Sequence, residues 1–595
     1  MKKRIFKLGF TVVLTAIIAA ALFVAVSADE ITGNCGALGG NNIQYKFDGQ
    51  EGTLELYGEG FMNDYGTCGP WYSYREEIRE IKILDGVSNI GEHAFNGCKN
   101  LTSITIPDSV TTIDDGAFDG CQNLKNLYIS DLVSWINVDK NSYPLKYGDG
   151  TLYINGIVAT DIIVPDSITS IKRGTFRGCS SLVNVSIPDS VTSIGESAFC
   201  ECTNIKNISL GNGVTIIEDH AFYECKKLTG ILLPKAVTNI GNDAFALCGL
   251  TSISIPNGVL NIGDRAFSNC HELVNISLSD SVEVIGRLVF NETAYYLDIS
   301  NWENENVLYI GKHLIKSKST ISGSYLVKMG TLTIAGEAFR QCGKLTDVYI
   351  SPGVKSIGMM AFYYCNNLQY VDIPEGVAEI GESAFSYTKL ESIYIPESVT
   401  HIGEGAFFRC YNLTHVNIPD GITVINDSTF CQCSLTDIVL PDSITSIGNN
   451  AFNWCDFTSI VFGNNVKNIG KDAFSNCFAL VSVKFENGKT EIHEDAFELC
   501  NALSRICCYP NSTADKYFCD SEYQKEYLIY DFTPGDSNGD GDINAKDAVL
   551  LAQKLAGWTV DIDDSAADCN GDGTINAKDA VLLAQFLAGW DVILG

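Results

Sequence analysis

The residues best suited to chemistry lie near the carboxyl end of the chain, where one pattern of acidic and amide side chains occurs twice. Each copy spans twelve residues and has glycine, Gly541 or Gly573, at its sixth position. Ca²⁺ prefers about six to eight hard oxygen ligands, and the glycine permits the sharp turn that gathers them. The pattern therefore predicts two calcium sites, with Asp542 and Thr574 contributing backbone carbonyls. The predicted ligands are Asp536, Asn538, Asp540, Asp542, Asn544 and Asp547, and Asp568, Asn570, Asp572, Thr574, Asn576 and Asp579.

Two features distinguish these segments from an ordinary EF-hand. Position 12 is Asp547 or Asp579 rather than glutamate, and a helix-forming stretch follows each loop but does not precede it. Residues 536–590 therefore resemble the type I dockerin, a small module that attaches secreted proteins to scaffolds bearing cohesin domains. The resemblance implies a small all-α domain, two Ca²⁺ ions as cofactors and a cohesin partner.

The dockerin resemblance also implies which residues contact cohesin, namely those near positions 10, 11 and 18 counted from the start of each loop. These residues are identical in the two halves. The resemblance therefore implies a pseudo-twofold module that can bind cohesin in either of two orientations. The implied contact residues are Ala545, Lys546 and Gln553 in the first half, and Ala577, Lys578 and Gln585 in the second.

The largest part of the chain, residues 81–508, repeats about 16 times with a period of about 22–23 residues. In a unit such as residues 101–121, an alternating Leu-x-x-Ile-x-Ile run predicts a strand with one buried face. A Pro-Asp turn, a second short strand at Val-x-x-Ile-Gly and an Ala-Phe-x-x-Cys segment follow, the last expected to form a short turn of helix. Because one unit cannot bury its apolar face alone, the pattern predicts a mainly β solenoid of parallel, stacked strands.

Most of the 22 cysteines occupy one place in this repeat. Fourteen of them, from Cys98 to Cys500, follow a repeat phenylalanine by three residues, and we expect a buried ladder of free thiols that act as small apolar residues. Metal sites would need clusters such as C-x₂-C, and the pairs in 200–202 and 431–433 are too closely spaced. The sequence leaves open one disulfide between Cys35 and Cys68, and one among Cys507, Cys508 and Cys519.

The repeat resembles that of the BspA-like leucine-rich repeat family of bacterial surface and secreted proteins, because a phenylalanine recurs in every unit from Phe95 to Phe497. The resemblance covers residues 81–503 and implies a curved, β-rich solenoid with adhesive or protein-binding roles. Two insertions, near 130–160 and 291–335, interrupt the period and share a Leu-Tyr-Ile signature. We expect each insertion to form an extra hairpin or an irregular coil that projects from the solenoid.

The order of segments predicts the domain organisation. Residues 1–28 combine a basic start, an apolar stretch and small residues before Asp29, which predicts a signal peptide; an uncleaved anchor is the alternative, because the apolar stretch is long. Residues 29–80 are predicted to form a β-rich cap that includes Trp71 in its core. Residues 509–532 are predicted to close the array, and 533–595 form the dockerin-like domain. No segment after residue 28 is long and apolar enough to span a membrane.

The net charge and the absence of catalytic motifs exclude several classes of function. The net charge of −32 argues against a nucleic-acid or anionic-membrane partner. No catalytic motif is present, and the recurring carboxylates follow proline in turns, so we predict that the protein is not an enzyme. On the outward strand face, four side chains in consecutive repeats suggest a ligand site, although tyrosine also simply favours strands. They are Tyr349, Tyr370, Tyr394 and His415.

Together these patterns predict a secreted binding or adhesion protein. Its dockerin would attach it to the cohesin scaffold of a cellulosome-like complex that degrades polysaccharide, in the extracellular space or at the cell surface. Its solenoid would bind a protein or a plant-wall polysaccharide. An accessory carbohydrate-active enzyme and a purely structural spacer are the alternatives.

Overall fold

The computed structural model describes residues 30–37, 42–508, 512–520, 528–530, 535–540, 542–560, 562–570, 574–590, 592 and 594. The predicted signal peptide, the residues 533–534 and the loop residues Gly541, Asp572 and Gly573 lie outside this set, as does the side chain of Cys519. The chain divides into two compact units, one comprising Met1–Ser277 with Val289–Leu297 and the other Leu278–Leu288 with Asp298–Gly595. Among the described helices, none has the length and apolar character needed to cross a membrane.

The first unit opens with an antiparallel sheet that continues into the repeats. The elements of this sheet are β1 (Ile31–Asn34), β2 (Ile43–Asp48), β3 (Thr53–Gly58), β4 (Glu80–Ile83), β6 (Ser103–Thr105), β8 (Asn126–Ile129), β10 (Thr151–Ile154) and β11 (Ile157–Val158). From β3 to β10 the pairing is parallel, and Leu54, Ile81 and Ile104 occupy equivalent, buried register positions. Trp71 is fully buried and its ring stacks on Phe95 at 5.5 Å, so it covers the first apolar layer as predicted.

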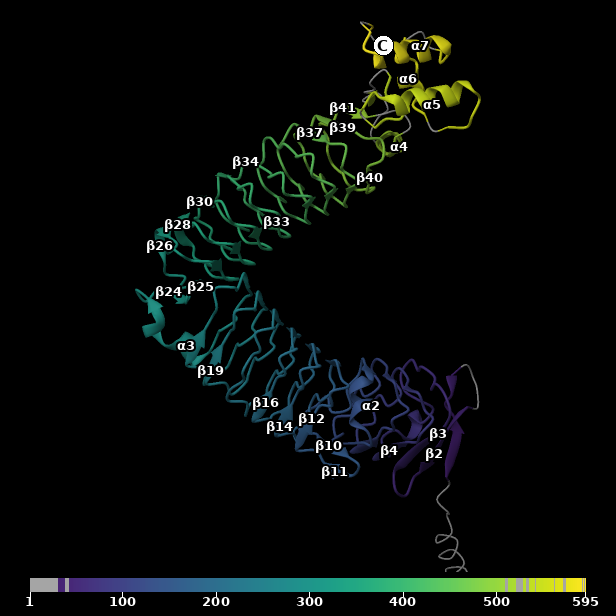
Figure 1. Ribbon diagram of the computed structural model, residues 1–595, viewed down its shortest axis with the longest axis vertical. Coiled ribbons are helices and arrows are strands. Elements are labelled where there is room, and N and C mark those ends of the chain that lie inside the picture. Colours follow the sequence, from purple (N-terminus) through teal and green to yellow (C-terminus); the bar gives the residue numbers. More distant parts are fainter. Residues whose placement is uncertain are drawn as a thin grey trace, which may run out of the picture. The chain divides into compact units, whose positions relative to one another are not determined.

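Most repeats of the first unit contribute to two rows of parallel strands (Figure 1). The longer strands after β10 are β12 (Asp161–Ile163), β14 (Asn184–Ser186), β16 (Asn207–Ser209), β19 (Ser252–Ser254) and β21 (Asn275–Ser277). The predicted second short strand is confirmed in β5 (Asn89–Ile90), β7 (Thr112–Ile113), β9 (Asp139–Lys140), β13 (Ser170–Ile171), β15 (Ser193–Ile194), β17 (Ile216–Ile217), β18 (Asn239–Ile240) and β20 (Asn261–Ile262). The short helices are η2 (Tyr72–Tyr74), α2 (Leu132–Asn137) and α3 (Ala294–Leu297).

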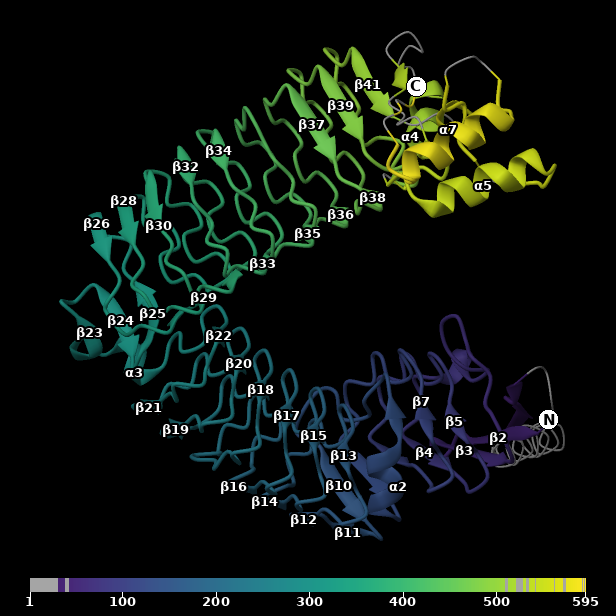
Figure 2. The same cartoon turned by 45° about the horizontal axis from the view of Figure 1, so that its top comes forward.

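The second unit repeats this plan, and Figure 2 shows its strands following one another in chain order. Its first elements are β22 (Val284–Ile285), η3 (Ile299–Asn301), β23 (Trp302–Glu303), β24 (Val307–Ile310), β25 (His313–Ser317), β26 (Ser322–Leu326), β27 (Thr333–Ile334), β28 (Lys344–Tyr349), β29 (Ser356–Ile357), β30 (Tyr370–Asp372), β31 (Glu379–Ile380), β32 (Ser392–Ile393), β33 (His401–Ile402) and β34 (His415–Val416). There follow β35 (Val424–Ile425), β36 (Ser446–Ile447), β37 (Ser459–Phe462), β38 (Asn468–Ile469), β39 (Ser482–Phe485), β40 (Glu491–Ile492), β41 (Arg505–Cys508), α4 (Thr513–Asp520) and β42 (Leu528–Tyr530).

A column of phenylalanine rings runs through the core of each unit, and in the first unit it has two stretches, Phe95 to Phe118 and Phe176 to Phe290. Rings of neighbouring repeats, such as Phe199 and Phe222 or Phe362 and Phe385, lie nearly parallel with centroids 5.3–5.4 Å apart. Burying one such ring stabilises the fold by about 1.5–3 kcal/mol, and the aromatic contact adds about 0.5–1.5 kcal/mol. The stack therefore fixes the register between successive repeats.

The Ala-Phe-x-x-Cys segment does not form the turn of helix that we expected. In the described repeats it forms hydrogen-bonded turns instead, and the residue two positions after the phenylalanine has a left-handed backbone, as in Glu201 (φ 62°) and Tyr387 (φ 60°). A left-handed residue cannot continue a right-handed helix. The turn is closed by the cysteine N–H, which donates to the phenylalanine carbonyl, for example from Cys202 to Phe199.

Both insertions contain the expected hairpin, but neither hairpin simply projects from the solenoid. In the first, β10 pairs antiparallel with β11 and also parallel with β8. In the second, β24 and β25 form an antiparallel hairpin, and β25 pairs parallel with β27. One strand of each hairpin therefore adds to the repeat sheet, because its apolar residues, such as Leu152 and Leu314, occupy the buried register positions.

The carboxyl-terminal domain contains α5 (Ala545–Leu555), α6 (Asp564–Ala567) and α7 (Ala577–Leu587) (Figure 1). Its core is formed by Leu551 and Leu583 from the two longer helices together with Ala567 and Cys569. The matching positions of Leu551 and Leu583 in the duplicated sequence explain why the two helices pack against each other. This small core holds the two predicted calcium loops at the amino ends of α5 and α7.

Candidate metal centre and binding surfaces

The first predicted calcium loop folds around two fully buried carboxylates, Asp536 and Asp547. The Asp547 carboxylate accepts the backbone N–H groups of Asn538 at 3.1 Å and Asn544 at 2.8 Å. Asn544 is also the N-cap of α5, and its side chain accepts the N–H of Lys546 at 2.9 Å. The residue at position 12 therefore anchors the loop to the helix that follows, because it lies in the third position of that helix.

The second loop reproduces this arrangement in its described residues. The buried Asp579 carboxylate accepts the N–H groups of Asn570 at 3.2 Å and Asn576 at 2.7 Å. Asn576 caps α7 and accepts the N–H of Lys578 at 2.9 Å. The N-cap backbone angles agree within a degree, with φ −147° and ψ −172° at Asn544 and φ −148° and ψ −172° at Asn576. The sequence duplication is thus a duplication of local geometry.

The described residues of the first loop fit a calcium ion by their chemistry. Buried carboxylates are normally paired with a cation or coordinate a metal. The Nδ2 atom of Asn538 and the Oγ atom of Ser537 are also buried, without a hydrogen-bond partner among the described residues. An unpaired N–H donor does not favour a cation, so the fit to calcium rests on the buried carboxylates of Asp536 and Asp547. No three His, Cys, Asp or Glu side chains among the described residues form a metal cluster, and the predicted sites depend instead on asparagine and backbone oxygens as well.

The residues implied as cohesin contacts lie at equivalent places on α5 and α7. Ala545, Lys546, Ala577 and Lys578 are exposed, and the glutamines at 553 and 585 are half-buried. Lys546 Nζ lies 3.1 Å from Asp540 Oδ2, so this implied contact residue is adjacent to a predicted calcium ligand.

Two exposed tryptophans follow the helices of this domain and are not among the residues predicted from the sequence. Trp558 and Trp590 are 61% and 62% exposed. Their backbone N–H groups donate at 3.0 Å to the backbone carbonyl oxygens of Gln553 and Gln585, respectively. The repeated Ala-Gly-Trp in the sequence is the signal that pointed to them. Each tryptophan follows a glycine with a left-handed backbone, which ends the helix.

The four side chains predicted on the outward strand face form two columns rather than one row. Tyr349 pairs in register with Asp372, and Tyr370 pairs with Asp347, so the two tyrosines lie diagonally, with ring centroids 5.6 Å apart. Tyr394 is the most exposed of the three tyrosines, at 61%. His415 pairs in register with Ser392 of the preceding repeat, and its Nε2 atom lies 3.5 Å from Asp437 Oδ2. The structure thus places aromatic and carboxylate side chains alternately on this face.

The cysteine ladder is buried, as predicted, but its thiols are more than apolar filler. In most repeats the Sγ–H group donates to the carbonyl oxygen of the phenylalanine in the preceding repeat, for example from Cys202 to Phe176 at 2.9 Å and from Cys365 to Phe339 at 3.0 Å. The same bond recurs at Cys121, Cys225, Cys248, Cys270, Cys410, Cys433, Cys455, Cys477 and Cys500.

The sequence contained one signal for this hydrogen bond. The two repeats that lack the cysteine have Thr293 and Thr388 at its position. Both hydroxyls make hydrogen bonds, the first to Phe290 at 2.8 Å and the second with Cys410 Sγ at 3.2 Å. The position therefore keeps a hydrogen-bonding hydroxyl when the sulfur is absent, although neither of these two bonds goes to the phenylalanine carbonyl of the preceding repeat.

Comparison with known families accounts for both parts of this architecture. The profile of the BspA type leucine-rich repeat region matches residues 71–143, 153–253, 238–328, 332–456 and 423–525, which together make up more than half of the chain. The chain belongs to the BspA type leucine-rich repeat family. The profile of the dockerin type I domain matches residues 534–588. Leucine-rich repeats and dockerins are non-catalytic. Type I dockerins bind calcium and imply a cohesin partner and association with an extracellular cellulosome.

Several solved structures of leucine-rich repeat proteins are similar to parts of this chain. One from Bacteroides ovatus is 26% identical, with a TM-score of 0.29, and the match covers 62% of this chain and 92% of that one. One from Eubacterium ventriosum is 22% identical, with a TM-score of 0.27 and coverages of 79% and 95%. A leucine-rich cell surface protein from Faecalibacterium prausnitzii is 24% identical, with a TM-score of 0.26 and coverages of 76% and 95%. No curated protein matches the chain.

The disulfides that the sequence left open do not form among the described cysteines. Cys35 and Cys68 near the start of the BspA type solenoid are buried free thiols, as is Cys507 near its end. Burial raises the pKa of Cys35 to about 12, and that of Cys179 in the ladder likewise to about 12. The Cys35 and Cys179 thiols therefore remain protonated at neutral pH, which disfavours thiolate chemistry at these two positions.

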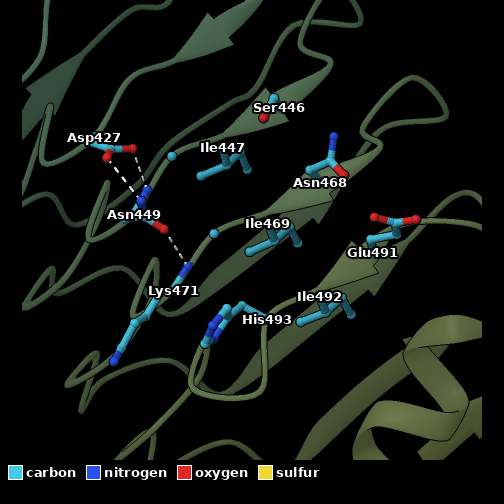
Figure 3. Close-up of a pocket in the computed structure, with 12 residues that line it drawn as sticks. Asp427, Ser446, Ile447, Asn449, Asn468, Ile469, Lys471, Glu491, Ile492 and His493 are labelled. Atoms are coloured by element: carbon cyan, nitrogen blue, oxygen red, sulfur yellow. Dashed lines mark hydrogen bonds between the residues drawn. The ribbon is translucent and has the colours of Figure 1, made fainter. Parts of the chain in front are cut away.

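The second unit contains a cavity of about 470 Å³ that spans the short strands β36, β38 and β40 (Figure 3). Its polar groups are hydrogen-bonded to one another across the repeats. The Asp427 carboxylate accepts the backbone N–H and the side-chain amide N–H of Asn449, and the Asn449 side-chain oxygen accepts the backbone N–H of Lys471. In the first unit, Asp219 and Asn242 make the same bonds. The carboxylate and amide groups of this cavity therefore serve the stacking of the repeats, and a ligand would have to displace those bonds.

Proposed function

We propose that this protein is a secreted, non-catalytic targeting component of a cellulosome, held on a cohesin scaffold by a calcium-loaded dockerin. The observation that carries the proposal is the duplicated loop–helix geometry around Asp547 and Asp579, in which the same hydrogen bonds recur in both halves. The BspA type solenoid then presents its ligand-binding faces to the surroundings of the complex. Export of the chain follows from the predicted signal peptide in residues 1–28.

We infer that the dockerin holds two ions. In the first half, the side chains of Asp536, Asn538, Asp540 and Asp547 would bind one ion, with oxygens of Asp542 and Asn544. The second half offers the equivalent set. A bound Ca²⁺ supplies the positive charge that compensates the buried carboxylates. The chain's own contribution is to orient these carboxylates, and the caps Asn544 and Asn576 fix the helices that follow.

We further propose that either half of the dockerin binds cohesin. The exposure of Ala545, Lys546 and Gln553 matches that of the equivalent residues on α7, which supports two equivalent orientations. Changing Lys546 and Gln553 to alanine should weaken binding only about twofold, because one of two equivalent orientations is lost. The matched change of Lys578 and Gln585 should have the same effect, and the fourfold variant should lose binding.

This dockerin proposal is tested by calorimetric titration of the full chain with a purified cohesin domain in excess calcium. A single-half variant that abolishes binding would refute the two-orientation proposal. Loss of binding on chelation of calcium is expected for every variant that binds.

We propose that the outward face around Tyr349, Tyr370 and Tyr394 binds the ligand of the solenoid, a protein or a plant-wall polysaccharide. Exposed tyrosines offer a large contact area together with a polar tip, and the alternating carboxylates can orient polar groups. The full chain would be tested against plant-wall polysaccharides and extracellular proteins, with the three tyrosines changed to alanine. The matched control changes Ser252, Ser254 and Ser277 on the outward face of the first unit. Equal binding by both variants would refute this role, and no binding by the wild type would favour the spacer function.

A further inference from the structure

A second exposed surface of the solenoid lies on the turns that carry the core phenylalanines, not on the strands. In the second unit, the residues just after Phe362, Phe385 and Phe407 are aromatic or basic and touch one another from repeat to repeat. Tyr364 and Tyr387 stack at 4.2 Å, and the Tyr387 ring meets Phe408 at 5.6 Å. We call this surface the turn ridge, and its members are Tyr363, Tyr364, Tyr387, Phe408, Arg409 and Tyr411.

The fold itself does not require these large side chains. The position two residues after the phenylalanine has a left-handed backbone in repeat after repeat, and the first repeats fill it with glycine, as at Gly97 and Gly120. Glycine adopts this conformation without steric cost, whereas Tyr364, Tyr387 and Arg409 adopt it at φ 59°, 60° and 59°. Bulky residues at a position where glycine suffices indicate that the side chains themselves are needed.

Arg409 is the cation among the turn-ridge residues, and its guanidinium is held from three sides. A second arginine, Arg340, lies over the Tyr363 ring at 5.8 Å, but it is paired with Glu337 at 3.0 Å. Its Nε–H donates to Gln432 Oε1 at 2.9 Å, and one terminal N–H donates to the Tyr387 hydroxyl at 2.9 Å. The guanidinium also lies over the Phe408 ring, 5.0 Å from its centroid. Among the described residues, no carboxylate is within ion-pair distance of Arg409, although the chain carries a net charge of −32. The group is therefore fixed in place with N–H donors still available.

The first unit contains a related arrangement in which the arginine charge is neutralised, although Arg177 directly follows Phe176 whereas Arg409 lies two residues after Phe407. Arg177 lies over the ring of Tyr143 and donates to Glu201 Oε1 at 3.0 Å. Glu201 is the middle residue of the Cys-Glu-Cys sequence at 200–202, and Gln432 is the middle residue of Cys-Gln-Cys at 431–433. The same acceptor position thus carries a carboxylate in one unit and a neutral amide in the other. Gln432 positions Arg409 without cancelling its charge.

The ring geometry bears on what the turn ridge binds. A sugar ring stacks on an exposed aromatic face, but Tyr364 and Tyr387 cover each other's faces, with an interplanar angle of 18°. Tyr364 and Tyr411 are 40% and 55% exposed, and the Tyr411 hydroxyl donates to Gln432 Oε1 at 3.3 Å. Tyrosine and arginine in contact are the composition typical of protein-binding hot spots. The surface therefore suits a protein side chain better than a glycan.

We propose that the turn ridge binds a protein segment that presents a carboxylate beside apolar side chains, with Arg409 pairing with the carboxylate. The segment's apolar groups pack on the edges of Tyr364 and Tyr411. This proposal adds a second surface and a partner class to the ligand-recruiting role proposed above. It does not involve the outward face or the dockerin.

The test uses the full-length protein and a displayed library of random peptides selected on immobilised wild type. The decisive variant is Gln432→Glu, which gives Arg409 the intramolecular carboxylate that Arg177 already has, while leaving every ring of the turn ridge in place. We expect selected peptides to be enriched in Asp or Glu next to apolar residues, and to bind Gln432→Glu about tenfold more weakly, because a charge-assisted hydrogen bond is lost.

Three further measurements make the outcome unambiguous. Arg409→Ala should lose the same peptides, and Arg177→Ala, the matched change in the first unit, should bind them normally. Replacing the selected acidic residue by its amide should reduce binding to wild type but not to Gln432→Glu. Selection of the same peptides by wild type and Gln432→Glu, no enrichment of acids, or binding of an acidic oligosaccharide in place of any peptide would overturn the proposal. Alanine variants of Tyr349, Tyr370 and Tyr394 should bind the peptides normally, which separates this test from that of the outward face.

Discussion

The thiol hydrogen bonds of the cysteine ladder give a prediction whose sign is unusual for a buried position. Cys202 is fully buried, and its Sγ–H donates to Phe176 at 2.9 Å. Valine at this position removes the donor and is larger than cysteine by about one methyl group, an increase that threonine shares. The Phe176 carbonyl still accepts the N–H of Cys179 at 3.0 Å, so it is not left without a partner. We therefore expect Cys202→Val to cost about 0.5–1.5 kcal/mol, the net value of one hydrogen bond.

Threonine and alanine complete the series. Cys202→Thr has nearly the shape of Cys202→Val but keeps a donor, so it should be more stable than the valine variant by about 1 kcal/mol. In an apolar core without a partner for the hydroxyl, the order would be reversed, because a buried unpaired hydroxyl costs about 1–3 kcal/mol. Cys202→Ala also opens a cavity the size of one sulfur atom, and we expect a total loss of about 2 kcal/mol.

The assay is hydrogen exchange followed by mass spectrometry of peptides from residues 176–225. In a repeat protein each unit contacts only its neighbours, so the loss should be confined to these repeats. Local opening free energies from exchange resolve such differences where a global unfolding curve would not. A valine variant that is as protected as the threonine variant, or more so, would refute the claim that these thiols act as donors.

Three other outcomes follow from the structure. Burial lowers the pKa of the Lys140 ammonium from 10.5 to about 7, so the unfolded state binds more protons than the folded state between these two pH values. The stability of the first unit should therefore rise with pH across that window. Thermal unfolding of Lys140→Met should lack this rise, whereas the exposed-site control Lys125→Met should keep it. The cysteine ladder should resist iodoacetamide in the native protein at pH 7.5, because burial keeps thiols such as Cys179 protonated. The same cysteines should react after denaturation, and intact mass counts the labels. Rapid labelling of the native ladder would contradict this explanation. Asp547→Ala removes the acceptor for the N–H groups of Asn538 and Asn544 and also removes a predicted calcium ligand. Calorimetry should therefore show that one ion is lost, and circular dichroism should show a loss of helix, with the exposed change Val549→Ala as the control. Two ions still bound would show that Asp547 is not a ligand.

The matched cysteine motifs show how a pattern can be noticed and its meaning missed. The sequences at 200–202 and 431–433 stood out only as cysteine pairs too tight for zinc. In the structure the middle residue is the important one, because Glu201 and Gln432 each receive an arginine from the preceding repeat. The arginine is separated from its acceptor by 23–24 residues. No local motif search would connect the two.

The sequence by itself determined the solenoid, its buried phenylalanine and cysteine positions, and the two dockerin loops. These features depend on periodicity and on ligand spacing, which are local properties of the chain. The left-handed turn at positions such as Tyr387, the incorporation of β10 into the sheet and the diagonal placement of Tyr349 and Tyr370 required the tertiary structure. Each of them depends on which residue of one turn lies beside which residue of the next. That register is set by the stacking of the core rings and the inter-repeat hydrogen bonds, and it brings together side chains that are one full repeat apart in sequence.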